Sequence, residues 1–165
     1  DVPTGFPKTP EGALGQLGAI TTTVLQGMSI ERAHHIHAAW SDPGAPPPEE
    51  WVLTANIQAF LGSGAGQYAD NLRTAVVVTP LAAQIKGTDG TDWVLACVLL
   101  DVKARVAAQA RIAYGHCERM QWSPLDGGRW VIGPGTAPTR APSTWPGTDL
   151  AIQAGWRTWA SAGDQ

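Results

Sequence analysis

The residues best suited to acid–base chemistry are His116 and Tyr114, with Asp101 as the candidate carboxylate. A histidine within hydrogen-bond reach of a carboxylate can take up and release a proton in the pH range where enzymes work. We expect residues 93–102 and 110–122 to be two strands of one antiparallel hairpin. Because side chains alternate between the faces of a strand, Asp101 would then point away from the face that carries His116. This arrangement counts against a His–Asp dyad.

The two cysteines, Cys97 and Cys117, lie on these same predicted strands. If the hairpin turns near Ala107, Cys97 faces Cys117, while Tyr114 faces Leu100 and His116 faces Val98. Directly opposed residues of antiparallel strands lie within the Cα separation that a disulfide allows. Such a bridge would suit an exported domain. Two free, buried thiols are the alternative, in a cytosolic protein or with a shifted register.

His34, His35 and His37 form the only histidine cluster in the sequence. On a helix His34 and His37 share a face, a spacing that can chelate a metal, and Glu31 lies three residues from His34. A metal site needs three or four ligands and a second shell, which the neighbourhood does not supply. We therefore expect a solvated helix surface and no metal.

Motifs for cofactor and nucleophile chemistry are absent from the sequence, which has no P-loop, GxSxG, HExxH or CxxC pattern. The glycine-rich residues 62–66 follow a predicted helix rather than a strand, so the context for phosphate binding is missing. We therefore expect no cofactor and no catalytic residues.

The composition is typical of a single globular domain of 165 residues with a mild net charge of −3. Lys and Arg do not cluster, so nucleic-acid binding is not expected. The longest apolar run, residues 94–100, is far shorter than the roughly 20 residues that span a bilayer. The eight tryptophans are expected to be ordinary core residues, with a lined pocket as the alternative.

The first half of the chain has helical periodicity after an extended arm at residues 1–8. Thr9 and Pro10 form a typical helix start, and Gly27 ends the run. Ser29 is the expected N-cap of a second helix, and Glu49 and Glu50 are expected to open a third that ends at Gly62.

The second half has the pattern of extended strands. We expect strands at residues 72–78 and 81–86, separated by Pro80, then at 93–102, 110–122 and 129–132, and a terminal helix from Thr148 or Asp149 through Trp159. Helices followed by long antiparallel strands indicate an α+β fold, with one domain over residues 1–165.

This layout resembles the NTF2-like, or cystatin-like, cone, in which N-terminal helices pack on a strongly curved antiparallel sheet. Residues 5–13 (GFPKTPEGA), the Arg129-Trp130-Val131-Ile132 strand and Trp145-Pro146-Gly147-Thr148 are also similar to an uncharacterised group of actinobacterial exported or membrane-anchored proteins. Proteins of that kind are associated with conjugation or secretion machinery. The resemblance implies an NTF2-like domain close in build to the extracytoplasmic domains of type IV secretion assembly factors.

Our leading hypothesis is a non-catalytic, extracytoplasmic protein-interaction domain of a conjugation- or secretion-associated cell-envelope assembly. Its expected partners are envelope proteins and a second copy of the chain. The chain begins at Asp1 rather than at a methionine, which fits the removal of a leader or anchor from an exported protein and fits a trimmed cytosolic protein as well. The alternative is a small-molecule-binding protein or acid–base enzyme whose cavity is lined by Trp93, Tyr114, His116 and Trp130. A metal-binding envelope protein using His34 and His37 is a third possibility.

Overall fold

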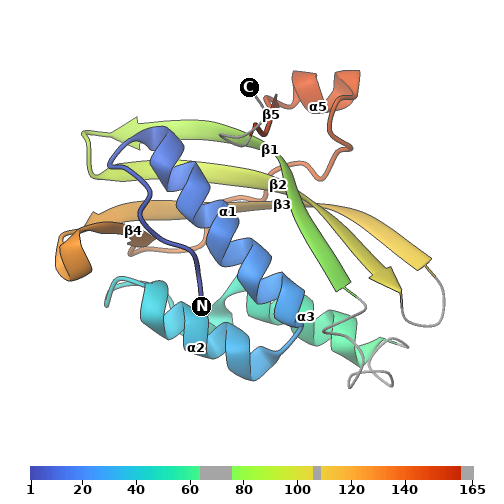
Figure 1. Cartoon of the computed structure of the whole chain (residues 1–165), viewed down its shortest axis with the longest axis horizontal. Coiled ribbons are helices and arrows are strands. Elements are labelled where there is room, and N and C mark those ends of the chain that lie inside the picture. Colours follow the sequence, from blue (N-terminus) through green and yellow to red (C-terminus); the bar gives the residue numbers. More distant parts are fainter. Residues whose placement is uncertain (64–75, 106–108, 161–165) are drawn as a thin grey trace.

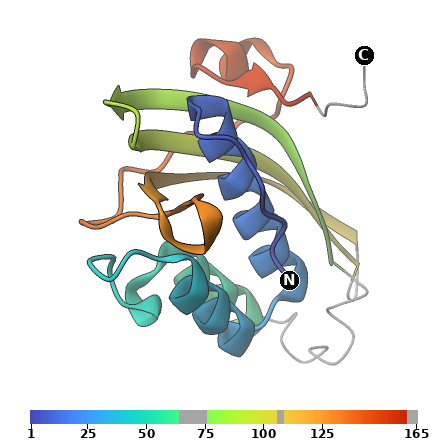
Figure 2. The same cartoon turned by 60° about the vertical axis from the view of Figure 1, so that its left-hand side comes forward.

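The computed structural model describes residues 1–63, 76–105 and 109–160 and has an α+β architecture. Helices come first in the chain and an antiparallel sheet follows (Figure 1). The helix α1 lies across one face of the sheet, which curves around it (Figure 2). Short segments from the end of the chain lie on the other side of the sheet and cover part of that face (Figure 1).

The first two helices begin where the sequence predicts, and the first also ends at the predicted Gly27. Helix α1 spans Pro10–Gly27, and the Thr9 side chain accepts a hydrogen bond of 3.0 Å from the Gly12 N–H. Helix α2 spans Ile30–Trp40, with Ser29 as its N-cap. Both caps satisfy backbone donors that the first helical turn leaves without partners.

The third helix is interrupted where we expected it to be continuous. Pro48–Glu50 forms a short 3-10 turn (η1), and α3 spans Val52–Gly62. Between them Trp51 has an extended backbone, with φ −70° and ψ 130°, and its side chain is buried. The tertiary contacts of one large side chain therefore override the helical periodicity here.

The sheet has five strands in the order β4-β3-β2-β1-β5, all paired antiparallel, and it is not closed. The strands are β1 (Val76–Asp89), β2 (Trp93–Arg105), β3 (Gln109–Ser123), β4 (Arg129–Ile132) and β5 (Arg157–Thr158). The expected register of the long hairpin is confirmed, because Cys97 pairs with Cys117 and His116 with Val98. Pairing continues to Arg105 and Gln109, so the hairpin is longer than predicted. Its turn, and the predicted start of the first strand at residues 72–75, lie outside the described residues.

The sequence predicted that Pro80 would break the first strand, and this prediction is wrong. Strand β1 runs continuously through it, with irregularities of register between Pro80 and Ala82 and between Ile85 and Gly87. Proline lacks a backbone N–H and is tolerated at a bulge or on a strand that has no full-length neighbour on one side. Strand β1 meets both conditions, since β5 pairs with it only at Ala82 and Ala83.

Parts of both edges of the sheet are covered by hydrogen bonds from other elements. The Gln26 amide of α1 donates to the Val76 carbonyl and accepts from the Val78 N–H at 3.0 Å. At the opposite edge the Asp42 N–H donates to the Ile132 carbonyl at 2.7 Å. Covered edges of this kind are poor templates for strand addition.

The two faces of the sheet carry separate apolar clusters, as strand alternation requires. The main core lies between the helices and the sheet and includes Leu17, Ile20, Leu53, Val98 and Leu100. The smaller cluster, on the other face, includes Cys97, Leu99, Cys117, Ala141 and Trp156. Even-numbered residues of β2 therefore face the helices, and odd-numbered ones face residues 141–158, which we call the C-terminal segment.

The predicted terminal helix through Trp159 is wrong, because α5 spans only Asp149–Gln153. Gly155 has φ +92°, a conformation that ends a helix and that residues with a Cβ rarely adopt. The chain then extends into β5, and Trp156 and Trp159 join different clusters. Within the described residues no helix combines the length and apolar character needed to cross a membrane.

Candidate functional site

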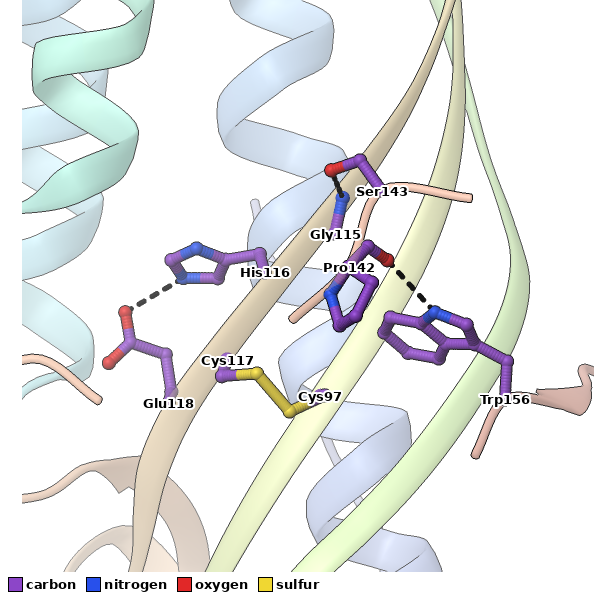
Figure 3. The surroundings of a disulfide bond; sticks show 8 residues. All are labelled: Cys97, Gly115, His116, Cys117, Glu118, Pro142, Ser143 and Trp156. Carbon is purple, nitrogen blue, oxygen red and sulfur yellow. Dashed lines mark hydrogen bonds and ion pairs between the residues drawn. A yellow bond between two sulfur atoms is a disulfide. The ribbon is translucent and has the colours of Figure 1, made fainter. Parts of the chain in front are cut away.

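The carboxylate that His116 contacts is Glu118, two residues further along β3. His116 Nε2 lies 2.8 Å from Glu118 Oε1, a hydrogen bond in which the Nε2–H tautomer donates. Both side chains are buried. They leave β3 on its helix-covered face, whereas Cys117 between them points to the other face (Figure 3).

Trp51 connects this pair to the helical layer. Its indole Nε1–H donates to the same Oε1 atom of Glu118 at 2.6 Å. The extended backbone of Trp51 interrupts the helix before α3 and places the indole over the sheet. The hydrogen bond to Glu118 therefore explains the interruption. A single carboxylate oxygen therefore accepts two buried donors, from β3 and from the segment between η1 and α3.

His37 of α2 completes the cluster and corrects the expectation of a solvated histidine face. Its side chain is buried, and its ring lies 4.9 Å from the Trp51 ring, measured between centroids. Burial lowers the pKa of His37, against the nearby charge of Glu118, which raises it. His37 Nε2 has no hydrogen-bond partner among the described residues. Burial of the ring therefore favours its neutral form.

The space beside this cluster is small. His37, Trp51 and Glu118 line a cavity of about 10 Å³. That volume is close to the minimum that holds one water molecule. A buried His–Glu pair can exchange a proton, but a substrate does not fit next to it in this arrangement. The geometry makes the cluster a polar connection between the helices and the sheet.

Of the other acid–base candidates, Asp101 lies apart from His116 and Tyr114 lies beside it. Asp101 lies on the opposite face, as predicted, where Arg111 donates to it through both Nε and Nη2. These bonds lower the pKa of Asp101, although its burial acts in the opposite direction. Tyr114 does share the face of His116, with ring centroids 6.3 Å apart, and accepts a hydrogen bond from the Asn56 amide of α3.

The structure does not bring the four cavity candidates together. Tyr114 lines a pocket beside α3, whereas His116 lies deeper in the domain. Trp130 is buried in the main core, where its indole N–H donates to the Pro7 carbonyl of the N-terminal arm at 2.9 Å. Trp93 alternates onto the other face of β2.

The two cysteines are joined by a disulfide, with a Cα–Cα separation of 4.1 Å. The bridge lies on the face of the sheet away from α1, beneath the C-terminal segment (Figure 3). Trp156 packs in the same cluster and donates from its indole to the Pro142 carbonyl at 2.9 Å. Gly115 of β3 allows the C-terminal segment to approach the sheet closely, because a Cβ at this position would lie 3.0 Å from the Ala141 carbonyl oxygen.

Sequence reasoning missed Glu118, Trp51 and Asn56. Glu118 had a usable signal, because residues two apart on a strand share a face and His116 was already a candidate. Trp51 and Asn56 had none, since only the packing of α3 against β3 brings them to this strand. For the metal alternative, the described residues contain no group of three or more His, Cys, Asp or Glu side chains able to hold an ion.

Comparisons of the chain with protein families, with curated proteins and with solved structures find no match. The functional argument therefore depends on the geometry of the chain itself.

Acidification is expected to destabilise the domain through His37. Because the folded-state pKa of His37 is lowered, the unfolded chain binds more protons, and stability falls as the pH drops from about 7 through the unfolded value of 6.5. Urea unfolding between pH 7.5 and pH 5 measures this effect. The His37→Gln variant should have a shallower dependence on pH, and equal slopes in the two proteins would contradict the assignment.

Proposed function

We propose that this chain is a non-catalytic, extracytoplasmic protein-interaction domain of NTF2-like build that works in a conjugation- or secretion-associated assembly of the cell envelope. The build is supported by α1 lying against a curved antiparallel sheet (Figure 2). The extracytoplasmic location is supported by the Cys97–Cys117 disulfide, because such bonds persist in oxidising compartments.

The observation that carries the interaction role is the exposed apolar surface of the C-terminal segment. Helix α5 buries Ala151 but leaves Leu150 68% exposed and Ile152 58% exposed. Trp145 of the same segment is 40% exposed. Leu150, Ile152 and Trp145 thus expose large apolar side chains on the same segment, and exposed apolar surface can serve as a protein contact site. Because parts of both sheet edges are covered, contact through these side chains is favoured over strand addition.

An acid–base enzyme has less support as a second function. The His116–Glu118 pair has the right chemistry, but the cavity beside it is only about 10 Å³. A substrate would require Trp51 to leave its hydrogen bond with Glu118. The cluster is better suited to holding the helical layer on the sheet.

Self-association provides the direct test, with a second copy of the chain as the partner. Sedimentation velocity over a range of concentrations should show a dimer that the Leu150→Ser/Ile152→Ser variant weakens, because the substitutions remove apolar contact area. Leu125→Ser is the matched control, since Leu125 is 70% exposed on the turn between β3 and β4. A strict monomer at every concentration would contradict self-association, and a loss in the Leu125 variant alone would place the contact at that turn.

A further inference from the structure

A second site lies beside the buried cluster, where α3 meets the sheet. A pocket of about 190 Å³ opens between the end of α1, one side of α3 and strands β2 and β3. Its walls are mainly apolar, with Leu25, Ile57, Phe60 and Val102 among the lining residues. An apolar cavity of about 150 Å³ is enough to bind benzene. The pocket therefore has room for one small ring or a short alkyl chain.

Two polar side chains, Asn56 and Tyr114, line the same pocket. The Asn56 amide donates to the Tyr114 hydroxyl oxygen. This bond leaves the phenol O–H free to be donated and the amide carbonyl of Asn56 as an acceptor. A ligand hydroxyl can both accept from Tyr114 and donate to Asn56, so it matches the pair better than a group that only donates or only accepts.

The electrostatics of the pocket favour a neutral ligand. Among the described residues that line it, none carries a charge. Burial raises the pKa of Tyr114, so its hydroxyl stays protonated and remains a donor at neutral pH. An anionic ligand would lose its hydration without gaining a cationic partner from these walls.

We infer that this pocket binds a small, neutral, mainly apolar molecule with one hydroxyl group, of the alkylphenol class. The hydroxyl lies between Tyr114 and Asn56, and the apolar part contacts Ile57, Phe60 and Val102. This binding is separate from the interaction role of the C-terminal segment. The NMR experiment below tests ligand binding and the sedimentation experiment tests self-association, so a negative result in one leaves the other proposal standing.

Methyl NMR with three matched probes tests the assignment. 4-Ethylphenol should shift the methyl signals of Ile57 and Val102 saturably and leave that of Ile152 on α5 unchanged. Ethylbenzene, which lacks the hydroxyl, should bind about 5- to 160-fold more weakly, the range expected for the loss of two neutral hydrogen bonds. 4-Ethylbenzoate, which adds a negative charge, should bind more weakly than either.

The Tyr114→Phe variant removes the donor and keeps the ring. It should lower the affinity for 4-ethylphenol by about 2- to 12-fold, the range expected for one neutral hydrogen bond, and leave ethylbenzene binding unchanged. Asn56→Ala is the second variant, at a half-buried position: it removes the acceptor and should likewise weaken 4-ethylphenol binding while leaving ethylbenzene binding unchanged. Absence of saturable shifts at Ile57 and Val102 would overturn the proposal, as would equal affinity of the wild-type protein for all three probes.

Discussion

Replacing Glu118 with alanine is expected to lower the free energy of unfolding by about 2–6 kcal/mol, because two buried donors lose their acceptor at about 1–3 kcal/mol each. Oε1 of Glu118 accepts from Trp51 Nε1 at 2.6 Å and from His116 Nε2 at 2.8 Å. Without the carboxylate both donors remain buried with no acceptor, and each then carries its full desolvation penalty. Urea unfolding followed by tryptophan fluorescence measures the loss.

Two variants control this experiment. Glu118→Gln keeps an oxygen that can accept from Trp51 but removes the charge, so a smaller loss of stability is expected. Glu31→Ala removes a carboxylate that is exposed on α2, and its effect should stay within about 0.5 kcal/mol. If Glu118→Ala were as mild as Glu31→Ala, the cluster would not hold the helical layer on the sheet.

Removing the disulfide should cost about 3 kcal/mol of stability while leaving the fold unchanged. Cys97 and Cys117 are 20 residues apart in the sequence, and closing a loop of this length restricts the unfolded chain by about that amount in the chain-entropy account. The strands stay paired through their backbone, because the bridge lies within a hairpin that extends well beyond it on both sides. Urea unfolding of wild type and of the Cys97→Ala/Cys117→Ala variant measures the difference.

Reduction of the wild-type protein provides the matched comparison. Unfolding in the presence of dithiothreitol should bring wild type close to the double variant, and the double variant itself should not respond to the reductant. Alkylation followed by mass spectrometry should label the two cysteines only after reduction and unfolding. A wild-type protein that is labelled without reductant, or whose stability is insensitive to it, would favour the alternative of two free thiols.

Local signals in the sequence were sufficient where the structure depends on neighbouring residues. Thr9 with Pro10, and Ser29, define the starts of two helices because capping involves atoms only three residues apart. The pairing of Cys97 with Cys117 follows from a hairpin, whose register depends on its turn and on alternation. The opposite orientation of Asp101 and His116 follows from the same alternation.

Contacts between distant segments were beyond this kind of reasoning. The extended backbone of Trp51 interrupts a helical pattern because its indole finds Glu118, 67 residues away in the chain. Pro80 stays within a strand because β1 has only a short neighbour on its outer side. The end of α5 depends on Gly155 and on Trp156 packing beneath the sheet with the disulfide.

The sequence alone thus determined the α+β order, the two helix starts, the hairpin register and the separation of Asp101 from His116, all of which depend on short-range geometry. The tertiary structure decided that His37 is buried rather than solvated, that Glu118 is the partner of His116, and that Tyr114 meets Asn56 in a pocket. Each of these depends on how α2 and α3 pack against β3. Packing between segments that far apart is set by the combined burial of many side chains, and no single motif encodes it.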